Sequence, residues 1–250
     1  MTDAARALCS DFYVNHKLGV KMDLPKGRES VLDLFERLRK QFPQMNQLRR
    51  FREEVALESP QAEPPHRWVA MRGNTIRSGT VNAAAWDESY ALHLSVLELA
   101  PFFLNISPLD VDHLELLYGF DMAAQGNHDA IVCQAFYSSS PLAALMELPD
   151  AHPIECQPTL GFALGEKAGS ELFVEVKTRT GPRGMRPAEP REDPISVYLT
   201  IRRFAPLRDV KELPALLKSM AEIGESVVQS HVIPSLLVPL RDAIGSSNSE

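Results

Sequence analysis

The chain has 250 residues, of which 44% are hydrophobic and 24% are charged, as in ordinary globular proteins. A chain of this length buries a large core without needing a disulfide or a metal ion for stability. Its three cysteines form no CxxC motif, no apolar run is long enough to span a membrane, and the first residues do not resemble a signal peptide. These features exclude a disulfide scaffold and a membrane span, and we expect a cytoplasmic protein without a metal or a cofactor.

Charge is segregated along the chain, although the net charge is only −7. Residues 1–78 carry a net charge of +4 and residues 167–250 a net charge of +1, whereas residues 79–166 hold 12 acidic residues and no Lys or Arg. Either these acids are scattered over the surface of a mostly buried segment, or they form a patch that meets a basic partner, such as the first segment of another copy. The acidic balance disfavours a general nucleic-acid binder.

In the first half, alternation of apolar and polar residues predicts a strand over 12–22. Apolar residues at helical spacing predict a helix over 30–42, with Ser30 as its N-cap and Pro43 at its end. Three further strands are expected near 51–58, 67–81 and 90–99. The Gly73-Asn74 pair can bend or turn the second of these three.

The second half has the same order of elements. A helical segment is expected over 127–148, with Asn127 as its N-cap and a break at 138–141. Strands are expected near 113–122, 157–165, 171–180 and 194–204. The stretch 181–193 is rich in Gly, Pro and Arg and is typical of a loop.

The C-terminal part has no counterpart in the first half. Residues 209–244 show helical spacing, and Pro234 and Pro239 are expected to divide this helix, because an interior proline removes a hydrogen bond. The final residues, 245–250, are expected to be a frayed tail.

The two halves also align with each other at nearly constant offsets. The aligned segments are 92–101 with 197–206, 67–79 with 172–184, and 18–22 with 118–122. We therefore expect an α+β fold: a two-layer sandwich whose largely antiparallel sheet comes from two β-α-β-β-β repeats related by a pseudo-twofold axis, with a long C-terminal helix. The expected divisions are residues 1–108 and 109–207 for the two repeats and 208–250 for the helical segment and tail.

The alternation assigns the strand residues to two faces. The apolar face is expected to be covered by the helices, and the other face is expected to be wetter. The polar residues assigned to this wetter face are Lys17, Lys21, Arg72, His93, Ser95, Asp121, Glu175, Lys177, Tyr198, Thr200 and Arg202. From both faces we take as candidate ligand-binding residues His16, His93, Arg72, Tyr198 and Arg202.

Other polar motifs have simpler interpretations. Cys133 lies five residues after His128, so on a helix the two point in different directions, and Cys133 is interpreted as a core thiol. The acidic stretch 110–115 is interpreted as a solvated turn rather than a metal site. Two arginine groups are the best candidates for binding an anion if they converge in space, namely Arg49, Arg50 and Arg52, and Arg183, Arg186 and Arg191.

None of the common catalytic motifs occurs, so no catalytic residue is assigned and an enzyme is the less favoured class. The leading hypothesis is a non-catalytic binding or assembly module that docks a protein partner or another copy on its open sheet face or in the groove between the repeats. The alternative is an enzyme or small-molecule binder with a pocket between the sheet and the C-terminal helix, near His16 or His93. A third hypothesis, nucleic-acid binding, follows from a resemblance in topology alone to the saddle of the TATA-binding protein and to sliding clamps.

Overall fold

The computed structural model describes residues 6–25, 27–165, 169–178, 193–204 and 206–247. Residues 181–192 of the expected loop, with all three of its arginines, lie outside the described residues, and so does the end of the tail. The described helices include none with the length and apolar character needed to cross a membrane.

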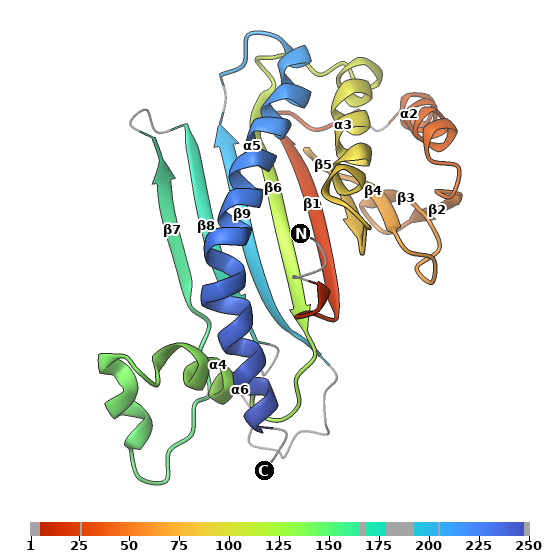
Figure 1. The fold of residues 1–250 in the computed structure, drawn as a ribbon. Coiled ribbons are helices and arrows are strands. Elements are labelled where there is room, and N and C mark those ends of the chain that lie inside the picture. The colour runs from red at the N-terminus through yellow and green to blue at the C-terminus, as the bar shows by residue number, and fades with distance from the viewer. Residues whose placement is uncertain (1–5, 26, 166–168, 179–192, 205, 248–250) are drawn as a thin grey trace.

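A single sheet of nine strands, antiparallel throughout, forms the centre of the molecule (Figure 1). The strands are β1 (Asp11–Val20), β2 (Gln47–Arg50), β3 (Glu54–Glu58), β4 (His66–Arg72), β5 (Thr75–Val81), β6 (Val111–Met122), β7 (Thr159–Leu164), β8 (Ser170–Lys177) and β9 (Ile195–Phe204). Their order across the sheet is β2-β3-β4-β5-β1-β6-β9-β8-β7. The first strand of each half, β1 and β6, therefore lie side by side near the middle, and each half extends outward to its own edge.

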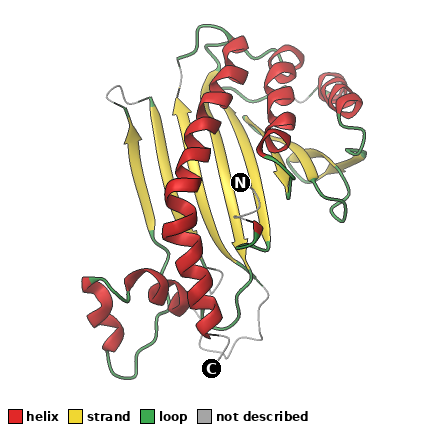
Figure 2. Ribbon diagram, viewed as in Figure 1, coloured by secondary structure: helices red, strands yellow, loops and turns green. Residues whose placement is uncertain are grey.

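The helices gather on one face of this sheet and at one of its ends (Figure 2). They are α2 (Arg28–Gln41), α3 (Trp86–Phe103), α4 (His128–Tyr137), α5 (Leu213–Val227) and α6 (Val238–Ser247), with 3-10 turns η1 (Pro141–Glu147) and η2 (Val210–Glu212) and a π-helical segment η3 (Val228–Leu237). Helix α3 packs on β1 and β5, and α5 packs on β6 and β9. The expectation of an α+β fold with an antiparallel sheet and a long C-terminal helix is thus confirmed.

The core lies between the sheet and these helices. Alternate residues of the central strands, such as Val14, Leu18 and Tyr118, are fully buried on the helix side. Leu217 and Met220 of α5 and Leu92 and Val96 of α3 cover them. Each such apolar side chain stabilises the fold by about 1.5–3 kcal/mol.

The prediction of a strand near residues 90–99 is wrong, because these residues belong to helix α3. The stretch alternates in part, but its buried residues, which include Leu92, His93, Val96, Leu97 and Ala100, follow helical spacing. His93 therefore lies on the buried side of a helix and not on the wetter face of a strand.

The internal duplication is not confirmed by the segments that suggested it. Residues 92–101 are helical, whereas residues 197–204, their expected counterpart, belong to β9. An alignment of apolar spacing does not distinguish a partly alternating helix from a strand, and this pairing of segments is wrong.

The expected division of the C-terminal helix is also wrong, since α5, η3 and α6 follow one another without a break. Pro234 lies inside η3, where the backbone N–H of Val238 donates to the carbonyl of Ile233, five residues back. The wider π-helical turn accommodates Pro234 within a continuous helix. The long helix consequently runs along the central strands of the sheet, over β6 and β9 (Figure 1).

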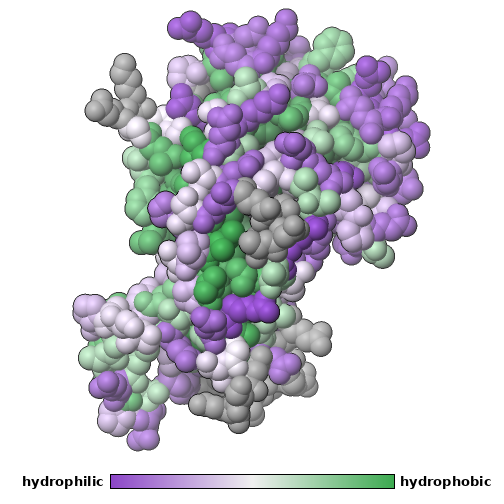
Figure 3. Space-filling view, in the orientation of Figure 1, coloured by the Kyte–Doolittle hydropathy of each residue, from purple (hydrophilic) through white to green (hydrophobic). Residues whose placement is uncertain are grey.

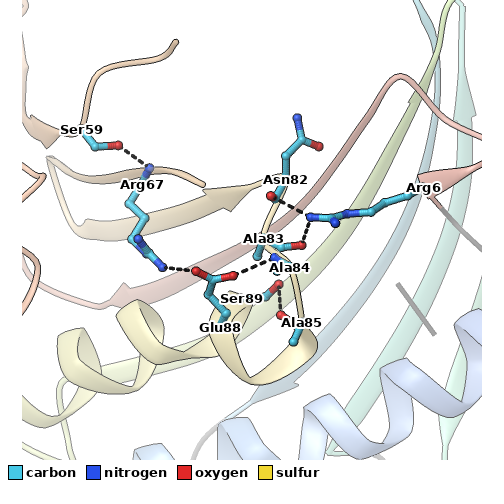
Figure 4. A network of polar contacts seen from close by, with 9 residues as sticks. All are labelled: Arg6, Ser59, Arg67, Asn82, Ala83, Ala84, Ala85, Glu88 and Ser89. Carbon is cyan, nitrogen blue, oxygen red and sulfur yellow. Dashed lines mark hydrogen bonds and ion pairs between the residues drawn. The ribbon is translucent and has the colours of Figure 1, made fainter. Parts of the chain in front are cut away.

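A polar network ties the first-half strands to the start of α3 (Figure 4). The Arg67 guanidinium donates to Glu88 Oε1 at 3.0 Å, and Glu88 Oε2 accepts the backbone N–H of Ala84 at 2.7 Å. The backbone N–H of Arg67 donates to Ser59 Oγ at 2.8 Å. Because the side chain of Arg67 is only 10% exposed, Glu88 compensates much of the charge that β4 buries there.

Replacing Glu88 by alanine is expected to lower the free energy of unfolding by about 2 kcal/mol, because a nearly buried guanidinium loses its partner. Glu88→Gln removes the charge but keeps one of the two acceptor oxygens, so it is expected to lose about half as much. Urea denaturation of the two variants measures the difference. Equal stability of Glu88→Ala and the parent would show that the ion pair contributes nothing.

Candidate functional site

An open cavity of about 930 Å³ lies at the β2–β3 end of the sheet, beside the start of α2. Its floor is apolar and includes Leu24, Val31 and Met71, which are all buried. At its rim, the large apolar side chains of Leu48 and Phe51 are 55% and 53% exposed. The cavity therefore offers unsatisfied apolar surface to a ligand.

Four arginines line the same cavity, and three segments of the chain contribute them. Arg50 and Arg52 come from the β2–β3 hairpin, Arg28 from the first turn of α2, and Arg72 from the end of β4. The hairpin closes where the backbone N–H of Phe51 donates to the carbonyl of Glu54 at 2.8 Å. This tight turn brings Arg50 and Arg52, which the sequence marked as anion candidates, into one site with Arg72.

Three of these four guanidinium groups are uncompensated. Arg28, Arg50 and Arg52 form no ion pair or side-chain hydrogen bond with any described residue. Arg72 is 3.4 Å from Glu53, in a pair whose side chains are both mostly exposed.

The acidic residues of the lining leave this positive charge in place. Of the three acidic residues in the lining, Glu54 pairs with Arg77, which lies outside the lining, and Glu53 faces Arg72. Asp23 is the third, and none of the ion pairs between described residues joins it to the arginines of the cavity. At the start of α2, the N-cap residue Gly27 provides no side-chain cap, so the amide groups of the first turn contribute positive potential, which Glu29 of the same turn partly offsets. A rim of uncompensated cations over an apolar floor suits an anionic group attached to an apolar one.

The open face of the sheet holds two more of the candidate residues, Tyr198 and Arg202. Arg202 donates to Glu115 Oε2 from both Nε and an Nη, at 2.9 and 2.7 Å, and stacks over Phe173 at 5.7 Å. Tyr198 lies beside Tyr13, with 6.4 Å between ring centroids. Burial raises the pKa of Tyr13, so this tyrosine remains a neutral hydrogen-bonding group. Arg202, the cation of this cluster, is already paired with Glu115, whereas three arginines of the cavity have no such partner among the described residues.

His16 and His93 lie on the other face, in the interior, where Ser78 of β5 joins them. Ser78 Oγ is 2.8 Å from His16 Nδ1 and 2.7 Å from His93 Nδ1, and all three side chains are at most 1% exposed. A serine next to a histidine is the contact that a nucleophile makes with its base. Here the burial of all three residues closes that contact to a substrate, and we interpret the network as structural.

The proton positions in this network follow from its acceptors. Burial lowers the pKa of His93 to about 3, so the ring is neutral. Its Nε2 faces the carbonyl of Val14 at 3.1 Å and must donate, so Nδ1 accepts the hydroxyl proton of Ser78. Ser78 Oγ then accepts from His16 Nδ1–H, and His16 Nε2 keeps a buried lone pair with no hydrogen-bond partner.

The remaining motifs act in local structure. As expected, Asn127 caps α4, accepting the N–H groups of Asp129 and Ala130. Buried Asp129 accepts from Thr178 and from the backbone of Cys156, each at 2.8 Å. Cys133 packs against the core, and burial raises the pKa of Cys156 to about 12, which disfavours a thiolate. In the described part of the chain, no cluster of residues could hold a metal ion.

The candidate residues thus fall into three places: Arg72 in the cavity, Tyr198 and Arg202 on the open face, and His16 and His93 in the interior. A ligand-binding role for each remains a prediction. The sequence reasoning missed Arg28, Phe51 and Ser78. Phe51 stands within the run Arg49–Arg52, and an apolar side chain among arginines was a signal of an amphipathic site.

Neither a protein-family model nor a curated protein sequence matches the chain. The interpretation of the site therefore depends on its own geometry.

Proposed function

We propose that the protein is a cytoplasmic, non-catalytic binding module that takes an acidic, partly apolar segment of a protein partner into the cavity at the β2–β3 end. The observation that carries this proposal is that one cavity with an apolar floor is lined by three arginines that form no ion pair with any described residue. Glutamate or aspartate side chains of the partner would form ion pairs with the arginines of the cavity, and its apolar side chains would cover Leu48 and Phe51.

Close packing argues against the alternative of a pocket beneath the C-terminal helix. Gly224 of α5 lies against the Tyr118 ring with no room for a Cβ atom. The Tyr118 hydroxyl is 2.8 Å from that of Tyr90 and donates to the carbonyl of Ala221 at 3.3 Å. This interface is filled by side chains at the point where that hypothesis needs a cavity.

Paired charges argue against nucleic acid on the open sheet face. Arg49, Arg77, Lys177 and Arg202 each lie within ion-pair distance of a glutamate there. Binding phosphates would require these pairs to break, which removes much of the gain.

We also retain an internal duplication as part of the proposal, in a different alignment. Each half begins with a central strand, continues with a helix and outer strands, and ends with a helix on the sheet, which pairs α3 with α5. In that alignment the basic cavity beside α2 corresponds to the region of α4 and β7, which lacks Lys and Arg. The two halves would then offer different surfaces to partners.

The charge reversal Arg50→Glu/Arg52→Glu is expected to weaken binding of a fluorescein-labelled peptide of alternating Glu and Leu by about 30-fold, from two contacts of about 1 kcal/mol each. The control Arg37→Glu/Lys40→Glu makes the same change of net charge on exposed residues of α2 outside the cavity lining. Fluorescence anisotropy at several salt concentrations measures the affinities, and binding should weaken as salt rises.

The outcomes separate the hypotheses. Loss of peptide binding in the cavity variant alone supports the proposal. Equal loss in both variants would mean that only the net charge of the protein matters and would contradict a site in the cavity. A parent protein that does not bind the peptide would overturn the proposal. A labelled oligothymidine that binds more tightly than the peptide would favour nucleic acid instead.

A further inference from the structure

The outer edge of the sheet at β7 differs from the opposite edge at β2. Two of the four residues of β2 are arginines, whereas β7, Thr-Leu-Gly-Phe-Ala-Leu, has no charged residue and no proline. Natural sheets protect their edge strands with charge, proline or bulges, because an unprotected edge pairs with other strands. No strand among the described residues pairs with the outer side of β7 (Figure 1).

The hydrogen-bonding groups that β7 turns outward can be identified. The N–H of Val176 donates to the carbonyl of Pro158 at 2.9 Å, so this pair is a hydrogen-bonded one. Such pairs alternate along an antiparallel ladder. In the observed register, Thr159, Gly161 and Ala163 are consequently the non-bonded residues, and their N–H and C=O groups point away from β8.

The side chains of β7 divide by size between the two faces. Leu160 and Phe162 point to the helix side, where they are 58% and 52% exposed, and Thr159, Gly161 and Ala163 point to the open face. Apolar surface is visible along this edge in Figure 3. Leu142, Leu145 and Leu148 of the η1 region, beyond the start of β7, are also about half exposed or more.

This pattern is self-complementary under a twofold axis through Gly161. In an antiparallel pair of two β7 strands, Gly161 meets Gly161 of the other copy and Thr159 meets Ala163, which forms about six backbone hydrogen bonds. Leu160 then lies opposite Phe162 of the other copy, and each covers the other's exposed apolar surface.

The edge strand β7 could pair with β7 of a second copy or with β2 of a second copy, and charge distinguishes the two. Pairing of β7 with β2 of another molecule would bring Arg49 and Arg50 into the ladder, and their guanidinium groups would have to leave water or displace existing pairs. Pairing of β7 with itself brings in no charge. It also closes after two copies, whereas β7–β2 pairing continues into a filament.

We infer that two copies of this chain associate through antiparallel β7–β7 pairing centred on Gly161, which joins their sheets into one. The interface lies at the opposite edge of the sheet from the arginine-lined cavity, so it leaves both cavities open. The partner at this edge is a second copy of the chain.

Two double variants test the pairing and its register. Leu160→Lys/Phe162→Lys places lysines opposite lysines and is expected to abolish the dimer. Leu160→Lys/Phe162→Glu places each lysine opposite a glutamate of the other copy and is expected to retain it, with an affinity at most about tenfold weaker. Both variants change the same two exposed side chains, so the monomer fold should tolerate them equally.

Light scattering after size exclusion measures the mass, and the parent should reach about 56 kDa, twice the 27.8 kDa of the chain. Hydrogen exchange should show the amides of Thr159, Gly161 and Ala163 protected in the parent and exposed in the lysine variant. A parent that stays monomeric at roughly 100 µM, a dimer that survives the lysine pair, or loss of the dimer in both variants would each overturn the inference.

Discussion

Lowering the pH from 7 to 5 is expected to reduce the free energy of unfolding by about 4 kcal/mol through His16 and His93 alone. Both rings are buried, at 1% and 0% exposure, and both are neutral in the folded protein. Burial lowers the pKa of His93 from 6.5 to about 3, and burial together with the nearby His93 lowers that of His16 well below 6.5. In the unfolded chain both titrate near 6.5.

The direction follows from proton counting. Below pH 6.5 the unfolded chain binds protons that the folded protein does not, so acid favours unfolding. The stabilisation is complete above pH 6.5 and is lost as the pH falls toward the folded pKa values. Each histidine contributes about 2 kcal/mol to the loss between pH 7 and pH 5. Glu225, whose pKa burial raises, acts in the opposite direction, but its exposure makes that effect small.

Urea denaturation at a series of pH values measures this dependence. His93→Gln retains a donor and an acceptor but cannot titrate. Below pH 6 it should therefore reduce the slope of the free energy of unfolding against pH by the equivalent of about one bound proton. His231→Gln serves as the control, because His231 is exposed on the C-terminal helix. A parent whose stability is unchanged between pH 7 and pH 5 would contradict the burial of two neutral imidazoles.

Alternation in the sequence was sufficient to predict most strands because each has one buried and one wetter face. The strands β1, β6, β8 and β9 all lie where period-two spacing placed them, with Val14, Tyr118 and Leu199 on the buried side. The turn at Gly73 followed from glycine chemistry, and its φ of 55° is one that glycine adopts without strain. The helix break near Ser140 was likewise readable from local residues.

Elements buried on more than one side could not be assigned in this way. Helix α3 packs on β1 and β5 and against both α2 and α5, so apolar residues surround it and its periodicity is weak. The site depended on tertiary contacts as well. The contact of His16 with Ser78 requires the β1–β5 register, and the cavity requires the start of α2 and the β2–β3 hairpin to line the same space. Neither is encoded by spacing along the chain.

Alanine at Gly224 is expected to destabilise the protein by about 2–3 kcal/mol, although the same change usually stabilises the middle of a helix by about 1 kcal/mol. The reversal arises because a Cβ at Gly224 overlaps the Tyr118 ring, which is fully buried and held by hydrogen bonds to Tyr90 and Ala221. Gly245 of α6 has no atom within 4 Å of an added Cβ, so Gly245→Ala should be neutral or stabilising. Thermal and urea denaturation of both variants measure the contrast. If Gly224→Ala were as stable as Gly245→Ala, the long helix could not lie as close to the sheet as the fold requires, and the argument against a pocket beneath it would fail.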